Sequence, residues 1–472
     1  MPFAESTANV SGNKIVSLET ETRELIVNSR KMRVFASLGT GILAIALLAG
    51  CGGSGTQSAE TEESGPSNAN SSDEAVTLEY WSWAPNIDKI VDIWNDQNPN
   101  IQVNVNTSVG ANEIVAKLSA AKEAGNMPDV SNSTYEMLPN LIVNGIASDV
   151  TEGFGQYEDK VAEAAWNLVT FDGATYAVPQ GTSPMFLFYR VDIFDELKLK
   201  PPVTWEEYAD VARKIHEDDP KRFLTTFSAG DAQTFAALSQ QAGGEWWSVK
   251  DGVWNVDING EASQKVADYW QGLVDEGVIA TFKTWTPEWQ AALADGTLAS
   301  WISAAWAPPL IAENAPDAVG KWGAVRMPQW DASAPKAGVL GGSSTIVTTG
   351  TDHPDEALEF AIWLNNSEEA LTAFVDYVSV WPANLEGRNL PVLQNKVPEA
   401  LAPGFEDFYG LAAEIDQETV PVVWGPNVAL AFSTFNDSFS SAITSGGSFK
   451  EALDSVHKAT EDDMKNLGFD LK

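Results

Sequence analysis

Cysteine is almost missing from this chain, because Cys51 is the only one among 472 residues. One thiol cannot form a disulfide within the chain, and it cannot build a thiolate metal site. The fold must therefore be stabilised by burial of apolar side chains, which make up 44% of the sequence. A chain of this length can build two lobes of ~200 residues each.

Histidine and the common catalytic motifs are also scarce. The three histidines are His216, His353 and His457, and the patterns HExxH, GxSxG and Walker A do not occur. Metal-dependent and nucleophilic hydrolase mechanisms therefore lack their groups. A glycoside hydrolase needs only two carboxylates, so a glycan-active enzyme stays an alternative. We expect a protein that is not an enzyme and that has no metal and no cofactor.

Positive charge is sparse as well. Lysine and arginine together number 28 against 66 aspartates and glutamates, which gives a formal net charge of −38. Such a chain repels nucleic acid and anionic lipid head groups. We therefore expect no nucleic-acid partner, and we interpret the acidity as a solvated surface that keeps a secreted protein soluble.

The chain has no apolar run that reaches the ~20 residues of a membrane-spanning helix. The apolar stretch 34–49 follows a basic segment, Arg30-Lys31-Met32-Arg33, and ends in Leu47-Leu48-Ala49-Gly50-Cys51. This arrangement resembles the lipobox of bacterial lipoprotein signals. We expect residues 1–50 to be a cleaved signal peptide and the thiol of Cys51 to accept a diacylglyceryl group.

The residues on either side of the lipobox indicate where translation starts and how the mature chain is tethered. Glu19, Glu21 and Glu24 are acidic where a signal peptide is basic, so we expect translation to start downstream, with Met32 as one candidate. Residues 51–75 are small and polar and predict a flexible tether. The long acidic tether suits the outer face of the cytoplasmic membrane in a Gram-positive cell.

The chain after the tether alternates strands and helices. Apolar periodicity predicts strands at 76–80 and 101–105, helices at 87–94 and 114–124, and a third strand that ends at 132–133. This order predicts a doubly wound α/β lobe with its ligand crevice beyond the carboxyl ends of the strands.

Later segments carry equally clear local patterns. Asp172-Gly173 predicts a hairpin, and 185–189 and 298–302 are expected to be strands. Thr204 and Glu207 form a capping box, and Pro287 stands at a favoured first position of a helix.

The order of several short segments resembles a known family. These segments are Met127-Pro128-Asp129-Val130, Tyr176-Ala177-Val178-Pro179 with Phe188-Tyr189, Pro202-Val203-Thr204-Trp205-Glu206-Glu207, Ala304-Ala305-Trp306 and Gly338-Val339-Leu340-Gly341-Gly342. Together they resemble the extracellular solute-binding proteins of ATP-driven importers, in particular the carbohydrate-binding family that includes maltose-binding protein. The similarity covers essentially the whole mature chain.

The resemblance implies a two-lobed α/β fold of the type II periplasmic-binding-protein kind, with a hinge of several crossover strands. Lobe one is expected at 76–180 and 339–380, and lobe two at 181–338 and 381–472. Such a protein closes on its ligand by hinge bending and delivers it to the permease of an ABC importer. We expect a monomer, attached to the membrane through its lipid.

The chemistry of sugars selects the candidate ligand contacts. Sugars offer hydroxyls to polar groups and an apolar face to aromatic rings, and all 18 tryptophans lie beyond Cys51. Trp306 matches the position of a cleft tryptophan of the family. The other aromatic candidates are Trp81, Trp83, Tyr135, Trp246, Trp381 and Trp424.

The polar candidates are Asn132, Ser133, Gln180, Asp231, Gly342, Ser343 and Asn427. Asp231 aligns loosely with a sugar-binding carboxylate of the family, but a helix N-cap explains it equally well. For each tryptophan, packing in the core is the competing interpretation.

A different solute is the main rival. A peptide, a polyamine or an organic acid is the alternative ligand of such an importer. A polyamine needs carboxylates concentrated in the cleft, and an organic acid needs a cleft arginine, for which Arg190, Arg326 and Arg388 are the options.

Overall fold

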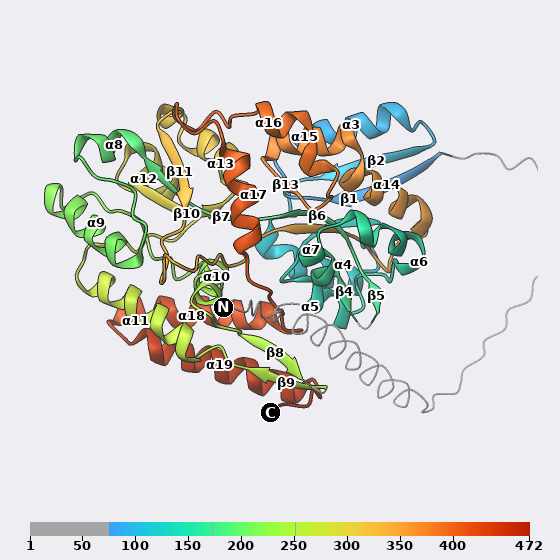
Figure 1. The fold of residues 1–472 in the computed structure, drawn as a ribbon. Coiled ribbons are helices and arrows are strands. Elements are labelled where there is room, and N and C mark those ends of the chain that lie inside the picture. The colour runs from blue at the N-terminus through green and yellow to red at the C-terminus, as the bar shows by residue number, and fades with distance from the viewer. Residues whose placement is uncertain (1–74, 172, 251) are drawn as a thin grey trace, which may run out of the picture.

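The computed structural model describes residues 75–171, 173–250 and 252–472. The lipobox, Cys51, Met32 and the tether up to residue 74 lie outside the described residues. Two α/β halves lie side by side, with the six-stranded sheet of the first half at the right and the three-stranded sheet of the second half at the left of Figure 1. The predicted two-lobed type II fold is confirmed.

The first half is built on a six-stranded sheet with the order β13-β6-β12-β3-β1-β2. β1 pairs in parallel with both β2 and β3, as the alternating strand and helix pattern predicts, whereas β12 and β13 run antiparallel to their neighbours. The strands are β1 (Val76–Trp81), β2 (Ile101–Asn106), β3 (Val130–Thr134), β6 (Val178–Thr182), β12 (Ser343–Val347) and β13 (Trp381–Pro382).

Helices cover this sheet and bury its apolar side chains. In α3, Ile87, Ile90, Val91 and Trp94 fall on one face at the spacing of 3.6 residues per turn, and all four are buried. The helices of this half are α3 (Ile87–Gln97), α4 (Ile114–Ala124), α5 (Leu138–Val143), α6 (Thr151–Phe154), α7 (Glu163–Val169), α14 (Pro354–Asn366) and α15 (Glu368–Val378). β4 (Thr170–Phe171) pairs antiparallel with β5 (Ala174–Thr175), as the predicted hairpin requires, whereas Asp172 of the turn lies outside the described residues.

The second half has a three-stranded antiparallel sheet of the order β10-β7-β11. Its strands are β7 (Met185–Arg190), β10 (Ser300–Ala304) and β11 (Trp322–Arg326). The strand predicted at 298–302 therefore begins two residues later, because residues 298 and 299 only approach Phe223 in a bridge. A separate hairpin is formed by β8 (Trp247–Lys250) and β9 (Val253–Val256).

The helices of the second half are α8 (Val191–Glu196), α9 (Trp205–Asp218), α10 (Ala232–Gln241), α11 (Glu261–Asp275), α12 (Pro287–Asp295), α13 (Ala307–Asn314), α17 (Phe408–Glu418), α18 (Val428–Ser445) and α19 (Phe449–Asn466). The capping box predicted at Thr204 and Glu207 is present at the start of α9. Pro287 is the first residue of α12, whose N-cap is Thr286. Local sequence signals thus define these helix starts correctly.

The chain crosses between the halves at Ser183-Pro184, between β6 and β7, and again in the connection from β11 to β12. A third crossing follows β13, which pairs with Gly181 and Thr182 of β6. This pairing places Trp381 and Pro382 in the sheet of lobe one, two residues beyond the expected end of that lobe at 380. α16 (Pro391–Asn395) then contacts both α15 and α17.

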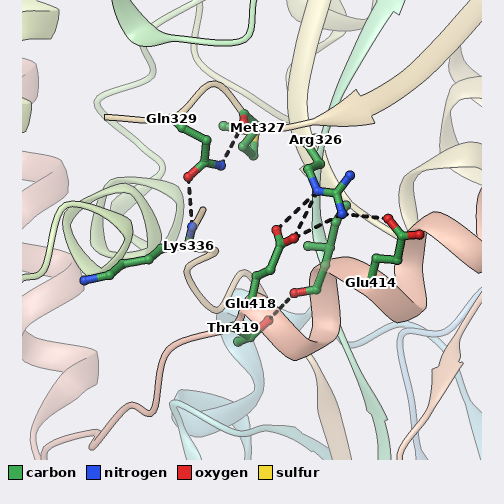
Figure 2. A network of polar contacts seen from close by, with 8 residues as sticks. Arg326, Met327, Gln329, Lys336, Glu414, Glu418 and Thr419 are labelled. Carbon is green, nitrogen blue, oxygen red and sulfur yellow. Dashed lines mark hydrogen bonds and ion pairs between the residues drawn. The ribbon is translucent and has the colours of Figure 1, made fainter. Parts of the chain in front are cut away.

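An ion-pair network anchors the second crossing (Figure 2). Arg326, at the end of β11, donates from Nε to Oε1 of Glu418 at 3.1 Å and from a terminal nitrogen to Oε2 of Glu414 at 2.7 Å. These two carboxylates raise the pKa of the Arg326 guanidinium, with the Glu418 hydrogen bond as the largest cause. The backbone N–H of Ala337 donates to Glu418 O at 3.0 Å, so α17 holds the connecting segment.

Candidate functional site

A cleft of about 1080 Å³ lies between the two lobes. This volume is at the upper end of the ~300–1,000 Å³ that is usual for small-molecule sites. The first lobe contributes the ends of β1, β3 and β6, and the second contributes β10, the start of α10 and residues 283–285. The cleft therefore opens at the carboxyl ends of parallel strands, where the sequence predicts it.

Eight of the predicted ligand contacts line this cleft. From lobe one come Trp83, Asn132, Gln180, Gly342, Ser343 and Trp381, and from lobe two come Asp231 and Trp306. They come from seven separate stretches of chain, and only the tertiary structure brings them together.

Asp231 caps a helix and also lines the cleft. Its Oδ1 accepts a hydrogen bond from Thr234 N at 3.1 Å, which caps α10, and the same side chain lines the cleft. Burial raises the pKa of the Asp231 carboxyl above its ordinary value. A carboxylate that is costly to desolvate accepts hydrogen bonds from ligand hydroxyls readily.

Several polar atoms of the cleft wall have no hydrogen-bond partner within the described residues. They are Thr134 Oγ1 and Gln180 Nε2 in lobe one, Ser303 Oγ in lobe two, and the indole Nε1 of Trp381. Each of these four side chains is more than nine-tenths buried. An unsatisfied buried polar atom costs about 1–3 kcal/mol, so a ligand that pairs with these atoms from both lobes gains affinity and favours closure.

Other predicted contacts are tied up inside the molecule. Tyr135 is buried and does not line the cleft, because its ring lies under Gly342, where a Cβ would stand 2.7 Å from Tyr135 Cε2. Burial strongly raises the pKa of the Tyr135 hydroxyl. Ser133 is fully buried and donates to Thr134 O at 2.9 Å. Trp81, at the end of β1, packs against the core of lobe one instead of facing the cleft.

Three further candidates are buried in lobe two and do not line the cleft. Trp246 is 3% exposed and donates to Ser263 Oγ at 3.0 Å, and Trp424 packs against Trp247 at a ring distance of 6.1 Å. Asn427 donates to Thr460 O at 2.9 Å, which ties α18 to α19. The loop context suggested exposure, but the last two helices fold over these side chains and cover them.

Trp285 and Lys283 are cleft residues that the sequence interpretation missed. Both lie in the short segment between α11 and α12. The sequence signal that could have identified Trp285 is a tryptophan among polar residues just before the helix that starts at Pro287. Trp301 of β10, expected only as part of a strand, also lines the cleft.

Charge is sparse in the cleft. Its charged side chains among the described residues are Glu113, Asp231 and Lys283, and Glu113 is paired with Lys117 at 3.0 Å. No arginine of the described chain lines the cleft. A cleft with so few free charges suits a neutral ligand.

The three arginines considered for an organic acid are each paired elsewhere. Arg190 is paired with Asp192 at 2.7 Å, Arg326 with Glu414 and Glu418, and Arg388 with Asp416 at 2.9 Å. Arg388 also lies over the ring of Trp381, 5.3 Å from its centroid. These cations stabilise the lobes and the hinge and do not line the cleft.

The lobes also touch each other directly. Glu136 of lobe one accepts a hydrogen bond from Gln233 Nε2 of α10 at 2.6 Å, and Asn140 Nδ2 donates to Pro426 O at 3.0 Å. Glu136 is 3% exposed, and burial raises the pKa of its carboxyl to about 7. The hydrogen bond with Gln233 thus places the Glu136 carboxyl, whose pKa is raised, at the junction of the two lobes.

The two lobes, the crossing strands between them and the polar, aromatic cleft define a hinge-bending solute receptor. Residues 89–398 match the bacterial extracellular solute-binding protein family. The chain belongs to this family.

Relatives and solved structures agree with this assignment. The chain is 24% identical to an arabinooligosaccharide-binding protein of Halalkalibacterium halodurans, over 77% of this chain and 84% of that one. It is 22% identical to a maltooligosaccharide ABC transporter solute-binding lipoprotein of Streptococcus pneumoniae, over 86% and 93% of the two chains. An ABC-transporter-associated binding protein of B. animalis subsp. lactis, solved with β-1,6-galactobiose, superposes with a TM-score of 0.78 at 25% identity, over 84% of this chain and all of that one. These relatives are binding proteins rather than enzymes.

Proposed function

We propose that this protein captures a neutral oligosaccharide in the cleft between its lobes and delivers it to the permease of an ATP-driven importer. The observation that carries the proposal is the wall of the cleft. It combines exposed indole surface with buried, unpaired donors and acceptors on both lobes. Aromatic faces pack on the apolar side of a sugar, and the polar atoms pair with its hydroxyls.

The charge of the cleft argues against the other solutes. An organic acid needs a cleft arginine, and each arginine near the hinge is engaged with a carboxylate instead. A polyamine needs several free carboxylates, whereas Asp231 alone among the lining carboxylates has no ion pair. The relatives named above bind arabinooligosaccharides, maltooligosaccharides and β-1,6-galactobiose.

The anchor at Cys51 is part of the same proposal. The family is extracellular, and one of the relatives named above is a lipoprotein. Among residues 75–171, 173–250 and 252–472, no helix is long and apolar enough to cross a membrane. A diacylglyceryl group on Cys51 would hold a monomeric receptor on the outer face of the cytoplasmic membrane, as in Gram-positive cells. Labelling with radioactive palmitate tests this, because wild type should take up the label and Cys51→Ser should not.

Titration calorimetry of the purified receptor tests the ligand class. The panel contains maltotriose, arabinotriose, β-1,6-galactobiose, spermidine and citrate. We expect heat with at least one of the sugars and none with spermidine or citrate. Trp306→Ala should weaken that binding, because Trp306 lines the cleft, whereas Trp330→Ala should not, because Trp330 packs against Trp205 outside it. Binding of spermidine or citrate without any sugar would contradict the proposal.

A further inference from the structure

Trp285 is held in an unusual position for so large a side chain. It is 46% exposed, and its φ of +66° lies in the left-handed region that favours glycine. A bulky residue is strained in this region, so surrounding contacts must hold it in place. A strained, exposed indole at a cleft wall is poorly explained by stability alone.

The segment around Trp285 is fixed at both ends. On one side, Thr284 N donates to Ser228 Oγ at 3.1 Å. On the other, Thr286 Oγ1 donates to Lys283 O at 2.7 Å and caps α12 through Trp289 N. These bonds hold the indole in a defined place before any ligand arrives, which lowers the entropy cost of binding.

The indole belongs to a group of four tryptophans in lobe two. Trp285 lies 5.3 Å from Trp289, 5.8 Å from Trp301 and 6.2 Å from Trp306, measured between ring centroids. Trp289 and Trp301 are buried, and Trp301 also lines the cleft. Both Trp285 and Trp306 line the cleft, and their planes differ by only 32°.

The spacing of these two rings decides how a ligand can use them. At 6.2 Å they are within the range of direct aromatic contact, so a sugar ring cannot enter between them. A sugar must lie on the surface that the two rings present together. The unpaired Ser303 Oγ, on the same strand as Trp301, lines the same wall of the cleft.

We propose that Trp285 is a specificity-determining residue that extends the Trp306 surface, so that the cleft selects saccharides of two or more rings over single sugars. The inference rests on the proposed function and adds a chain-length preference to it. A monosaccharide placed on Trp306 leaves Trp285 exposed, whereas the adjoining ring of an oligosaccharide covers it. The gain from Trp285 therefore grows with the length of the ligand.

Calorimetry with matched pairs of sugars tests this: galactose with β-1,6-galactobiose, arabinose with arabinotriose, and glucose with maltotriose. Trp285→Ala should weaken binding of the longer ligand about 10- to 100-fold and change binding of its monosaccharide by no more than about twofold. Trp285→Gly should behave in the same way while relieving the backbone strain, so a poorly folding alanine variant does not prevent the test. Trp285→Phe should restore part of the affinity, and Trp330→Ala should leave both ligands unaffected.

The outcomes separate this inference from the proposed function. If wild type binds none of the sugars, the proposed function fails. If wild type binds a sugar and the Trp285 variants bind every length as tightly as wild type, or weaken all lengths equally, Trp285 does not set chain length. A loss confined to the longer ligands, with wild-type unfolding temperature in the glycine variant, supports the assignment.

Discussion

Glu136 should make the stability of this receptor depend on pH in a way that a single substitution removes. The carboxyl is 3% exposed at the junction of the lobes, and burial raises its pKa from 4.5 to about 7. The folded state therefore holds a proton that the unfolded chain releases between these two pH values. By linkage, this contribution to stability is fully present below pH 4.5 and is lost as the pH rises to about 7.

The size of the effect follows from the pKa difference. At about 1.4 kcal/mol per pH unit, the difference between 4.5 and about 7 corresponds to about 3 kcal/mol. Glu136→Gln keeps an oxygen that accepts the hydrogen bond from Gln233 but cannot ionise. The variant should therefore be more stable than wild type by about 3 kcal/mol at pH 8, and the two should differ little at pH 4.5.

Urea denaturation of both proteins at several values between pH 4.5 and pH 8 measures this difference, and subtraction cancels the titration of all other groups. Glu113→Gln is the control, because Glu113 is also a carboxylate at the cleft but is exposed and paired with Lys117. Its curve should run parallel to that of wild type. A difference between wild type and Glu136→Gln that stays constant over the whole pH range would refute the reasoning.

Three further substitutions test the assignment of individual residues. Gly342→Ala should cost at least about 1–3 kcal/mol in unfolding free energy and weaken sugar binding, since φ is +86° and the new Cβ would meet the ring of Tyr135 at 2.7 Å; an unchanged urea midpoint would contradict this. Trp246→Ala should cost about 3–5 kcal/mol by leaving a cavity in lobe two, while folded protein at low temperature keeps the wild-type Kd; a selective loss of sugar binding would return Trp246 to the site. Asn427→Ala should cost about 1–3 kcal/mol, because it removes the donor to Thr460 O, and calorimetry should again show no change in Kd.

One helix, α17, links the two lobes at the hinge. Glu414 and Glu418 of α17 accept hydrogen bonds from Arg326 at the end of β11. Asp416 of the same helix accepts a hydrogen bond from Thr182 Oγ1 of β6 at 2.6 Å. One helix thus contacts the end of a strand from each sheet, and it lies between the two halves in Figure 1. Bending of the lobes must pivot around this helix or rearrange its ion pairs.

Much of the fold was set by local sequence. Apolar spacing marked α3 and β1 because a helix or strand at the surface of a core buries one face only. The capping box at Thr204 and the proline at position 287 marked helix starts, since these residues satisfy or remove backbone donors that a first turn leaves unpaired. The candidates at strand ends, such as Trp83 and Asn132, also reached the cleft.

The remaining assignments depended on tertiary structure. Trp246 and Trp424 occupy loop-like sequence, yet Phe432 of α18 packs against both rings, and only packing between distant segments decides which face of a loop is buried. Trp285 reaches the cleft through a left-handed backbone that no residue pattern announces for tryptophan. From the amino-acid sequence follow most of the helices and strands, the two-lobed fold and several of the residues that line the cleft, because local periodicity and strand ends carry these signals. The tertiary structure alone decided which indole rings remain open to a ligand, because exposure is a property of neighbours that lie far away along the chain.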